Sequence, residues 1–139
     1  MTLDRTIRLM PWYQFFNSLL FWQAVWFLYF QANLSGAEAI ILYSVYDIAT
    51  TLLEVPSGYF SDRIGRRLTL MLSAVCSVLG CLALAFGGSF AVYALGQSLI
   101  GAGSAFKSGT DSALLYEALD ATGRAEEIEA QELRVWRFT

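Results

Sequence analysis

The chain has 139 residues, of which 56% are hydrophobic and 15% are charged. A soluble domain usually carries about 25% charged residues, so this composition disfavours a soluble protein. Histidine is absent, which excludes a Ser-His-Asp triad, a histidine proton relay and histidine-based metal sites. The basic residues are too few and too scattered for a nucleic-acid-binding surface. The sequence shows no metal-ligand cluster, nucleophile elbow or phosphate-binding loop, so we expect neither an enzyme nor a cofactor.

Several apolar stretches are long enough to cross a bilayer core about 30 Å thick, which requires about 20 residues of helix. They predict an all-α integral membrane protein with about four transmembrane helices. The third stretch contains no charged residue and no polar stripe with helical period, which disfavours a soluble helical bundle. A polar, acidic tail follows at 117–139, and we expect it to be a helical, solvated, cytoplasmic connector. The four predicted spans cover residues 12–30, 39–60, 68–86 and 90–116.

Arginines lie on one side of the predicted spans. The connections 31–38 and 87–89 contain no lysine or arginine. The positive-inside rule therefore predicts that both termini and the connection between the second and third spans are cytoplasmic. The arginines that support this orientation precede the first span, fill the second connection or follow the fourth span: Arg5, Arg8, Arg63, Arg66, Arg67, Arg124, Arg134 and Arg137.

Small residues recur at a spacing of four in the third and fourth spans. Such spacing lets helix backbones approach closely in lipid, so it predicts a compact bundle. The sets are Ser73 with Ser77, Cys76 with Gly80, and Gly101 with Ala105 and Gly109.

The connection between the second and third spans carries a distinctive motif, GYFSDRIGRR, at residues 58–67. Gly58 and Gly65 permit tight turning and close approach. Asp62 can accept hydrogen bonds from the N–H groups that open the third span. The arginines supply planar donors for carboxylates of a neighbouring helix end.

This motif resembles the signature loop of the major facilitator superfamily, in which Gly, Asp-Arg and Gly-Arg-Arg/Lys follow one another between the second and third helices. The preceding stretch EVPSG, residues 54–58, is similar to the end of helix two in one branch of that family. In the family this loop is thought to act as a conformational latch. The resemblance assigns that role to Gly58, Asp62, Arg63, Gly65, Arg66 and Arg67.

The resemblance covers essentially the whole chain and implies helices 1–4 of a twelve-helix transporter that works by alternating access. We therefore expect a fragment, the N-terminal part of a secondary transporter of a small solute in a prokaryotic inner membrane. Its expected partners are the lipid bilayer, the remaining helices of the transporter and a substrate that the sequence does not identify. The alternative is a non-transporting small membrane scaffold or assembly protein that keeps the loop for folding.

A second resemblance lies in the fourth span. The stretch QSLIGAGSA, residues 97–105, is similar to the fourth-helix motif of drug–proton antiporters. Where that motif opens with arginine this chain has Gln97, so the proton-coupling role of the arginine is not transferred.

Four charged side chains fall inside the predicted spans: Asp47, Glu54, Lys107 and Asp111. Such side chains are costly in lipid and usually face a cavity or a partner, so they are candidates for conformational or substrate-binding roles as well as for structural pairing. Asp47 and Glu54 are seven residues apart and share a predicted helix face with Thr50, Thr51 and Gly58.

The partners of these charges remain open at this stage. Glu54 and Lys107 lie at similar predicted depth and could pair, whereas Lys107 could equally pair with Asp111 or extend to the inner surface. The stretch 108–117 resembles the inner end of helix four in the same family branch, where an acid can pair with the loop arginines. Asp111 or Glu117 would do so here.

Overall fold

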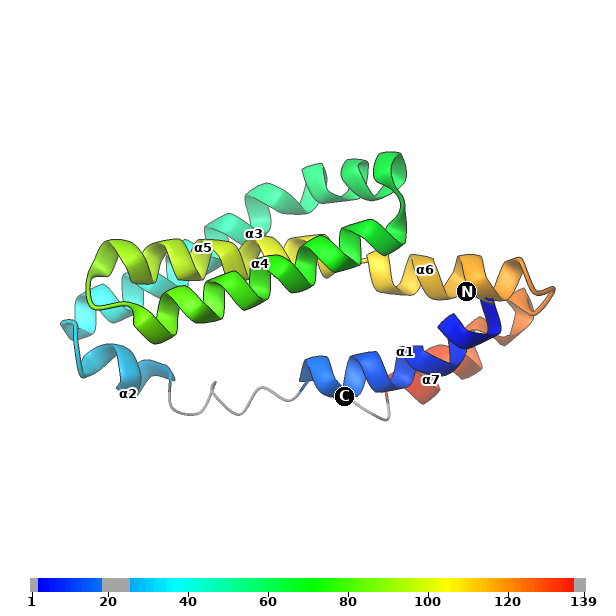
Figure 1. Ribbon diagram of the computed structural model, residues 1–139, viewed down its shortest axis with the longest axis horizontal. Helices are drawn as coiled ribbons and strands as arrows, with labels where there is room; N and C mark the ends of the chain where they lie inside the picture. Colours follow the sequence, from blue (N-terminus) through cyan, green and yellow to red (C-terminus); the bar gives the residue numbers. More distant parts are fainter. Residues whose placement is uncertain (1–2, 19–25, 137–139) are drawn as a thin grey trace. The chain divides into compact units, whose positions relative to one another are not determined.

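The computed structural model describes residues 3–18 and 26–136, and within these ranges every regular element is a helix (Figure 1). The chain divides into two compact units. The central unit is Trp22–Thr110, and the terminal unit combines Met1–Phe21 with Asp111–Thr139. The helices in chain order are α1 (Leu3–Ser18), α2 (Trp26–Gln31), α3 (Gly36–Ile64), α4 (Arg66–Phe86), α5 (Phe90–Lys107), α6 (Thr110–Asp120), the 3-10 helix η2 (Ala125–Glu127) and α7 (Ile128–Trp136).

The second and third predicted spans correspond to α3 and α4, which are the two helices in the described part of the chain that are long and apolar enough to cross a membrane. The count of about four spans stays a prediction. Helix α3 begins three residues earlier than predicted because Ser35 caps it. The Ser35 hydroxyl accepts a hydrogen bond from the N–H of Glu38, and the Glu38 carboxylate accepts one from the N–H of Ser35.

The ranges predicted for the first and fourth spans differ from the observed helices. Within 12–30, residues 19–25 lie outside the described residues, and the described parts belong to α1 and α2. The range 90–116 contains two helices rather than one. Helix α5 ends before Ser108, whose ψ of 118° leaves the helical region, and Gly109 adopts a φ of +71° that favours glycine. Gly109 therefore breaks the helix instead of extending the small-residue stripe.

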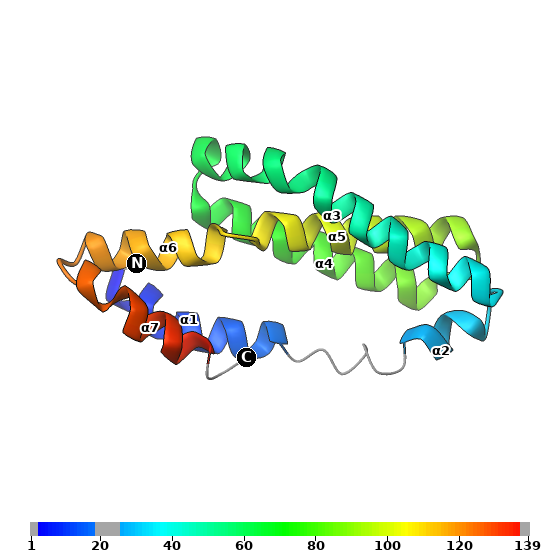
Figure 2. The same cartoon turned by 180° about the vertical axis from the view of Figure 1, so that it is seen from behind.

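In the central unit α3, α4 and α5 lie side by side, as both views show (Figures 1 and 2). An aromatic cluster closes the end of this bundle that lies near α2. Phe30 of α2 and Tyr93 of α5 are fully buried, with ring centroids 5.3 Å apart. The Tyr93 hydroxyl donates to the Gly87 carbonyl at 2.9 Å and the Tyr29 hydroxyl to the Leu84 carbonyl at 2.7 Å, so both phenols are satisfied.

Helix α5 contacts both neighbours through glycines. A Cβ added to Gly103 would lie 2.5 Å from Ser77 Oγ and 2.9 Å from the Ser73 carbonyl oxygen, both on α4. A Cβ on Gly101 would lie 2.7 Å from the carbonyl oxygen of Tyr46 on α3. The predicted close approach of backbones is therefore present on two faces of the same helix.

The terminal unit has a small aliphatic core. Its buried members are Ile7, Met10, Leu115, Ala118 and Leu119, with Tyr13 and Ile128 packed against them.

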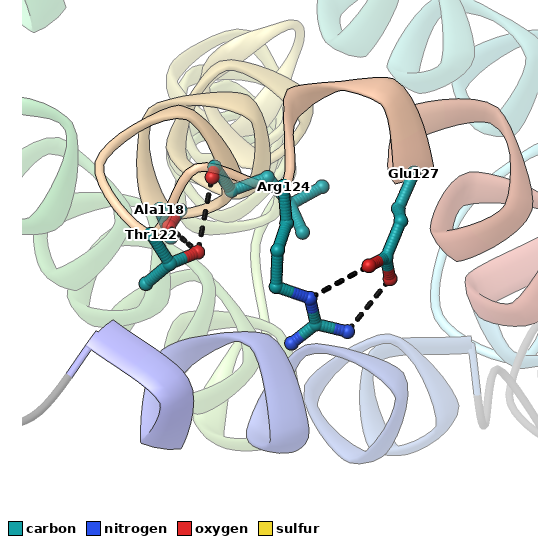
Figure 3. Close-up of polar contacts among 5 residues, drawn as sticks. Ala118, Thr122, Arg124 and Glu127 are labelled. Carbon is teal, nitrogen blue, oxygen red and sulfur yellow. Dashed lines mark hydrogen bonds and ion pairs between the residues drawn. The ribbon is translucent and has the colours of Figure 1, made fainter.

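Helix α6 ends in a glycine turn within this unit. Gly123 has a φ of +69°, and the N–H of Arg124 donates to the Leu119 carbonyl at 2.8 Å while the N–H of Gly123 donates to the Asp120 carbonyl. These two bonds define a Schellman motif, which satisfies carbonyls that the helix end leaves open. Thr122 donates back to the carbonyls of Ala118 and Leu119, and Figure 3 shows this turn beside the Arg124–Glu127 ion pair.

Candidate functional site

The motif predicted as a loop is almost entirely helical. Helix α3 continues to Ile64, α4 begins at Arg66, and Gly65 alone lies between them. Its φ of +95° and ψ of 144° are accessible to glycine and strained for other residues. The Gly65 N–H donates to the Ser61 carbonyl, and the Gly65 carbonyl accepts from both the N–H and the hydroxyl of Thr69. Gly65 therefore ends one helix and starts the next without a connecting loop.

Asp62 does not cap α4 as the sequence suggested. In the described part of the chain no side chain caps this helix, whose N-cap is Gly65. The Asp62 carboxylate instead pairs with the Arg66 guanidinium at 2.7 Å, across the corner. The Asp62 side chain is 66% exposed, which leaves it accessible to a further partner, whereas that of Arg66 is 24% exposed. Asp62 therefore holds the Arg66 guanidinium in place at the corner.

A buried pair of hydroxyls extends this contact into the bundle. Arg66 Nη1 donates to Ser61 Oγ at 2.9 Å, and the Thr110 hydroxyl lies 3.2 Å from the same oxygen. Ser61 is 1% exposed and Thr110 is 3% exposed. Sequence reasoning missed both residues. The available signal was the tendency of serine and threonine in membrane helices to bond across helix contacts.

The other motif residues occupy distinct places at the corner. The Arg63 guanidinium lies 5.2 Å from the centre of the Tyr59 ring, a cation–π contact on the exposed side of α3. Arg67 is exposed in the first turn of α4. Gly58 lies inside α3 and makes no turn, and a Cβ added there would meet no atom within 4 Å. The tight-turning role predicted for Gly58 therefore belongs to Gly65 alone.

Hydroxyls of α3 and α4 donate to backbone carbonyls of α5. Ser73 Oγ donates to the Gly103 carbonyl at 2.6 Å and Ser57 Oγ to the Ala105 carbonyl at 2.8 Å. Thr50 Oγ1 lies 3.3 Å from the Gly101 carbonyl. Thr50 therefore lies at the edge of the acidic face that adjoins α5. These bonds fix α5 between its two neighbours above the corner.

The predicted intramembrane charges lie in different environments. Asp47 and Glu54 are both exposed on α3. Glu54 Oε1 accepts a long hydrogen bond of 3.4 Å from Ser108, the residue after Lys107, and pairing with Lys107 itself stays a prediction. Lys107 is half-buried in the last turn of α5.

The two acids expected near the loop arginines lie in α6, within the terminal unit. Asp111 accepts a hydrogen bond from the N–H of Ser112 at 2.9 Å, and Glu117 is exposed. Their pairing with the arginines stays a prediction.

The Gln97 side chain is buried in the bundle without a hydrogen bond to any described residue. Gln97 is 1% exposed, and neither its amide nitrogen nor its oxygen makes a hydrogen bond there. It lies on α5 between Tyr93 and Ile100, which both belong to the apolar cluster. A buried amide without partners destabilises the fold by about 1–3 kcal/mol.

Residues 3–18 and 26–136 are all-helical in their regular structure, and the two long apolar helices, the backbone contacts through glycine and the arginine-rich corner are compatible with a membrane protein. The family model of the Major Facilitator Superfamily matches residues 11–123, most of the chain. The chain therefore belongs to the Major Facilitator Superfamily, a family of multi-pass membrane transporters. No curated protein and no solved structure matches it.

Proposed function

We propose that this chain supplies helices 1–4 of a secondary transporter that moves a small solute by alternating access, with the α3–α4 corner as its conformational latch. The observation that carries the proposal is the chain of contacts from Asp62 through Arg66 and Ser61 to Thr110. It connects an exposed carboxylate to the point where α5 gives way to α6.

The energetics of the corner suit a switch better than a permanent clamp. A surface ion pair contributes at most about 1 kcal/mol, so the Asp62–Arg66 pair adds little to stability. The pair instead orients Arg66, because the planar guanidinium donates to Asp62 and Ser61 at once. A neighbouring helix end that offers a competing donor or carboxylate would shift this arrangement at small energetic cost.

The proposal is tested on the longest reading frame of the locus, with all the hydrophobic spans that it encodes. Cells that express it are surveyed for uptake and efflux of a panel of radiolabelled solutes, and Asp62→Asn and Arg66→Gln are then measured on the solute that moves. We expect each variant to lower the initial rate by about tenfold or more at unchanged membrane abundance. Glu126→Gln, an exposed carboxylate in η2, is the matched control and should leave the rate unchanged.

Wild-type rates from the two corner variants would contradict the latch. Transport of no solute, together with a locus that encodes no further hydrophobic span, would favour the small scaffold or assembly protein.

We further propose that the protein lies in a prokaryotic inner membrane with both ends of this chain in the cytoplasm. The three arginines of the α3–α4 corner and the absence of basic residues from 87–89 support this orientation. A maleimide that does not cross the membrane should label Ser89→Cys in intact cells of a Cys76→Ser, Cys81→Ser background. Labelling of Arg67→Cys from outside instead would reverse the orientation.

A further inference from the structure

Helix α3 contains a proline, Pro56, two turns before its end at Ile64. Proline has no N–H, so the carbonyl of Leu52, one turn earlier, lacks the donor that an α-helix normally supplies. Changes in helix direction concentrate at such positions. Gly58 follows two residues later, and glycine resists bending of a helix interior less than any other residue. Residues 56–58 are therefore a weak stretch inside a long helix.

Between these two residues, Ser57 has a buried hydroxyl with two acceptors. Ser57 is 2% exposed. Its Oγ lies 2.7 Å from the Glu54 carbonyl oxygen in the same helix and 2.8 Å from the Ala105 carbonyl oxygen of α5. A hydroxyl carries one proton, so it bonds fully to only one of these oxygens at a time. The nearly equal distances place both acceptors within reach of that proton.

This pair of acceptors allows α3 to separate from α5 without leaving a buried donor unpaired. When the Ser57 proton passes to Glu54, the hydroxyl remains satisfied, and a bond of this kind to the preceding turn bends a helix slightly. The Ala105 carbonyl then loses a donor, and it lies in the last turn of α5, where the helix supplies none of its own. The bond to Ala105 therefore favours the straight form and leaves the bent form accessible.

The contacts of α3 with α5 differ in kind before and after Pro56. Before it the backbones lie close together, since a Cβ added to Gly101 would lie 2.7 Å from the Tyr46 carbonyl oxygen. After it the rings of Phe60 and Phe106 meet edge to face, with centroids 6.3 Å apart. Side chains can change rotamer when helices part, whereas backbones in contact have no such freedom. The last two turns of α3 are therefore the part that can leave α5.

We propose that α3 bends at residues 56–58, and that the Ser57 hydroxyl follows the bend by exchanging its acceptor on α5 for the one in its own helix. In the straight form the proton is available to Ala105, and in the bent form Glu54 alone accepts it. The inference rests on the proposed function, since the bend supplies the movement of the α3–α4 corner that a latch requires. The moving segment then lies between two pivots, this hinge and Gly65.

The test is fluorine-19 NMR of the whole chain in bicelles. A trifluoromethyl group is attached to one cysteine in the Cys76→Ser, Cys81→Ser background. The cysteine is either Ile64→Cys, after the hinge, or Ile48→Cys, before it, and both positions are exposed. We expect two resonances from Ile64→Cys, the minor one up to about 10% of the signal, and one resonance from Ile48→Cys.

Variants at the hinge locate the movement. Pro56→Ala restores the missing N–H and should lower the ratio of bent to straight forms by about tenfold or more. Ser57→Ala removes the bond to α5 that favours the straight form and should raise the ratio about fivefold. Ser98→Ala removes a hydroxyl that donates within its own helix, and it is the matched control together with Pro11→Ala of the terminal unit. Circular dichroism of each variant establishes that the helices persist.

A single resonance from Ile64→Cys overturns the proposal. A second resonance that Pro56→Ala leaves unchanged also overturns it, because the movement would then arise at Gly65. Splitting at Ile48→Cys as well would assign the movement to the whole helix, and an unchanged ratio in Ser57→Ala would refute the exchange of acceptors. These spectra require no translocation. A transporter that moved no solute would therefore refute the proposed function without affecting them.

Discussion

The central and terminal units of this chain each bury an apolar cluster, and they differ in the contacts that join their helices beside it. The central unit brings backbones together through glycines of α5 and ties them with hydroxyl-to-carbonyl bonds from Ser57 and Ser73. The terminal unit packs aliphatic side chains and closes its helix ends with the Schellman turn at Gly123 and the ion pair of Arg124 with Glu127.

The difference matters because each kind of packing stabilises a fold in a different solvent. Burial of aliphatic side chains stabilises a fold only where the alternative is contact with water. Between transmembrane helices that gain disappears, because lipid is as apolar as a leucine side chain, and close backbone contact and polar bonds replace it. The backbone contacts of the central unit are therefore of the kind that stabilises helices in lipid, and the aliphatic core of the terminal unit is of the kind that stabilises a fold in water.

The largest effect is expected from Gly103→Ala in the central unit. The new Cβ would lie 2.9 Å from the Ser73 carbonyl oxygen, which belongs to backbone and cannot rotate away. We expect the free energy of unfolding to fall by about 2 kcal/mol, measured by SDS titration of the purified protein in bicelles. Gly88→Ala, where a Cβ meets nothing within 4 Å, is the control. Equal effects at the two positions would contradict packing through glycine.

A smaller effect of opposite sign is expected from Gln97→Leu. Leucine fills similar volume and removes two buried polar atoms that have no partner among the described residues. We expect the free energy of unfolding to rise by about 1 kcal/mol in the same SDS titration. Gln31→Leu, at an exposed position at the end of α2, should change it little. A loss of stability at position 97 would reveal a polar partner for the amide.

The smallest effect concerns the terminal unit and depends on pH. Hydrogen bonds from Arg124 lower the pKa of Glu127 from its ordinary value of 4.5, and the charge of the same guanidinium acts in the same direction. Because the folded pKa is the lower one, the stabilisation is complete above the unfolded pKa and is lost as the pH falls through the folded pKa.

Carbon-13 shifts of the Glu127 carboxyl, followed during a pH titration, measure this contribution. Arg124→Gln should raise the pKa toward its ordinary value, and Arg124→Lys should raise it less because the charge remains. An unchanged pKa of Glu127 in Arg124→Gln would show that the ion pair does not lower it.

The sequence predicted the all-helical character of the chain, the family and the glycine-dependent corner at Gly65. It also predicted that Asp47 and Glu54 share one face of a helix, because residues seven apart lie above one another, and the structure leaves both acids exposed on α3. Thr50 lies about 60° around the helix from Asp47, on the side toward α5, where its hydroxyl lies 3.3 Å from the Gly101 carbonyl oxygen.

What the sequence could not supply was the identity of contacts between helices. Ser61 and Thr110 are 49 positions apart, and no local pattern predicts that their hydroxyls meet beside Arg66. The break at Gly109 was missed for a related reason. Glycine at a spacing of four is equally compatible with a helix contact and with a helix end, and only the backbone conformation distinguishes the two.

The corner at Gly65 also has a mechanical consequence. One residue outside helical geometry leaves a single pair of backbone dihedral angles between a helix of 29 residues and one of 21. The ion pair of Asp62 with Arg66 and the hydrogen bond of Arg66 to Ser61 both span that pair of angles. While these contacts hold, α3 and α4 should tilt together, and their release should leave each helix free to tilt about Gly65.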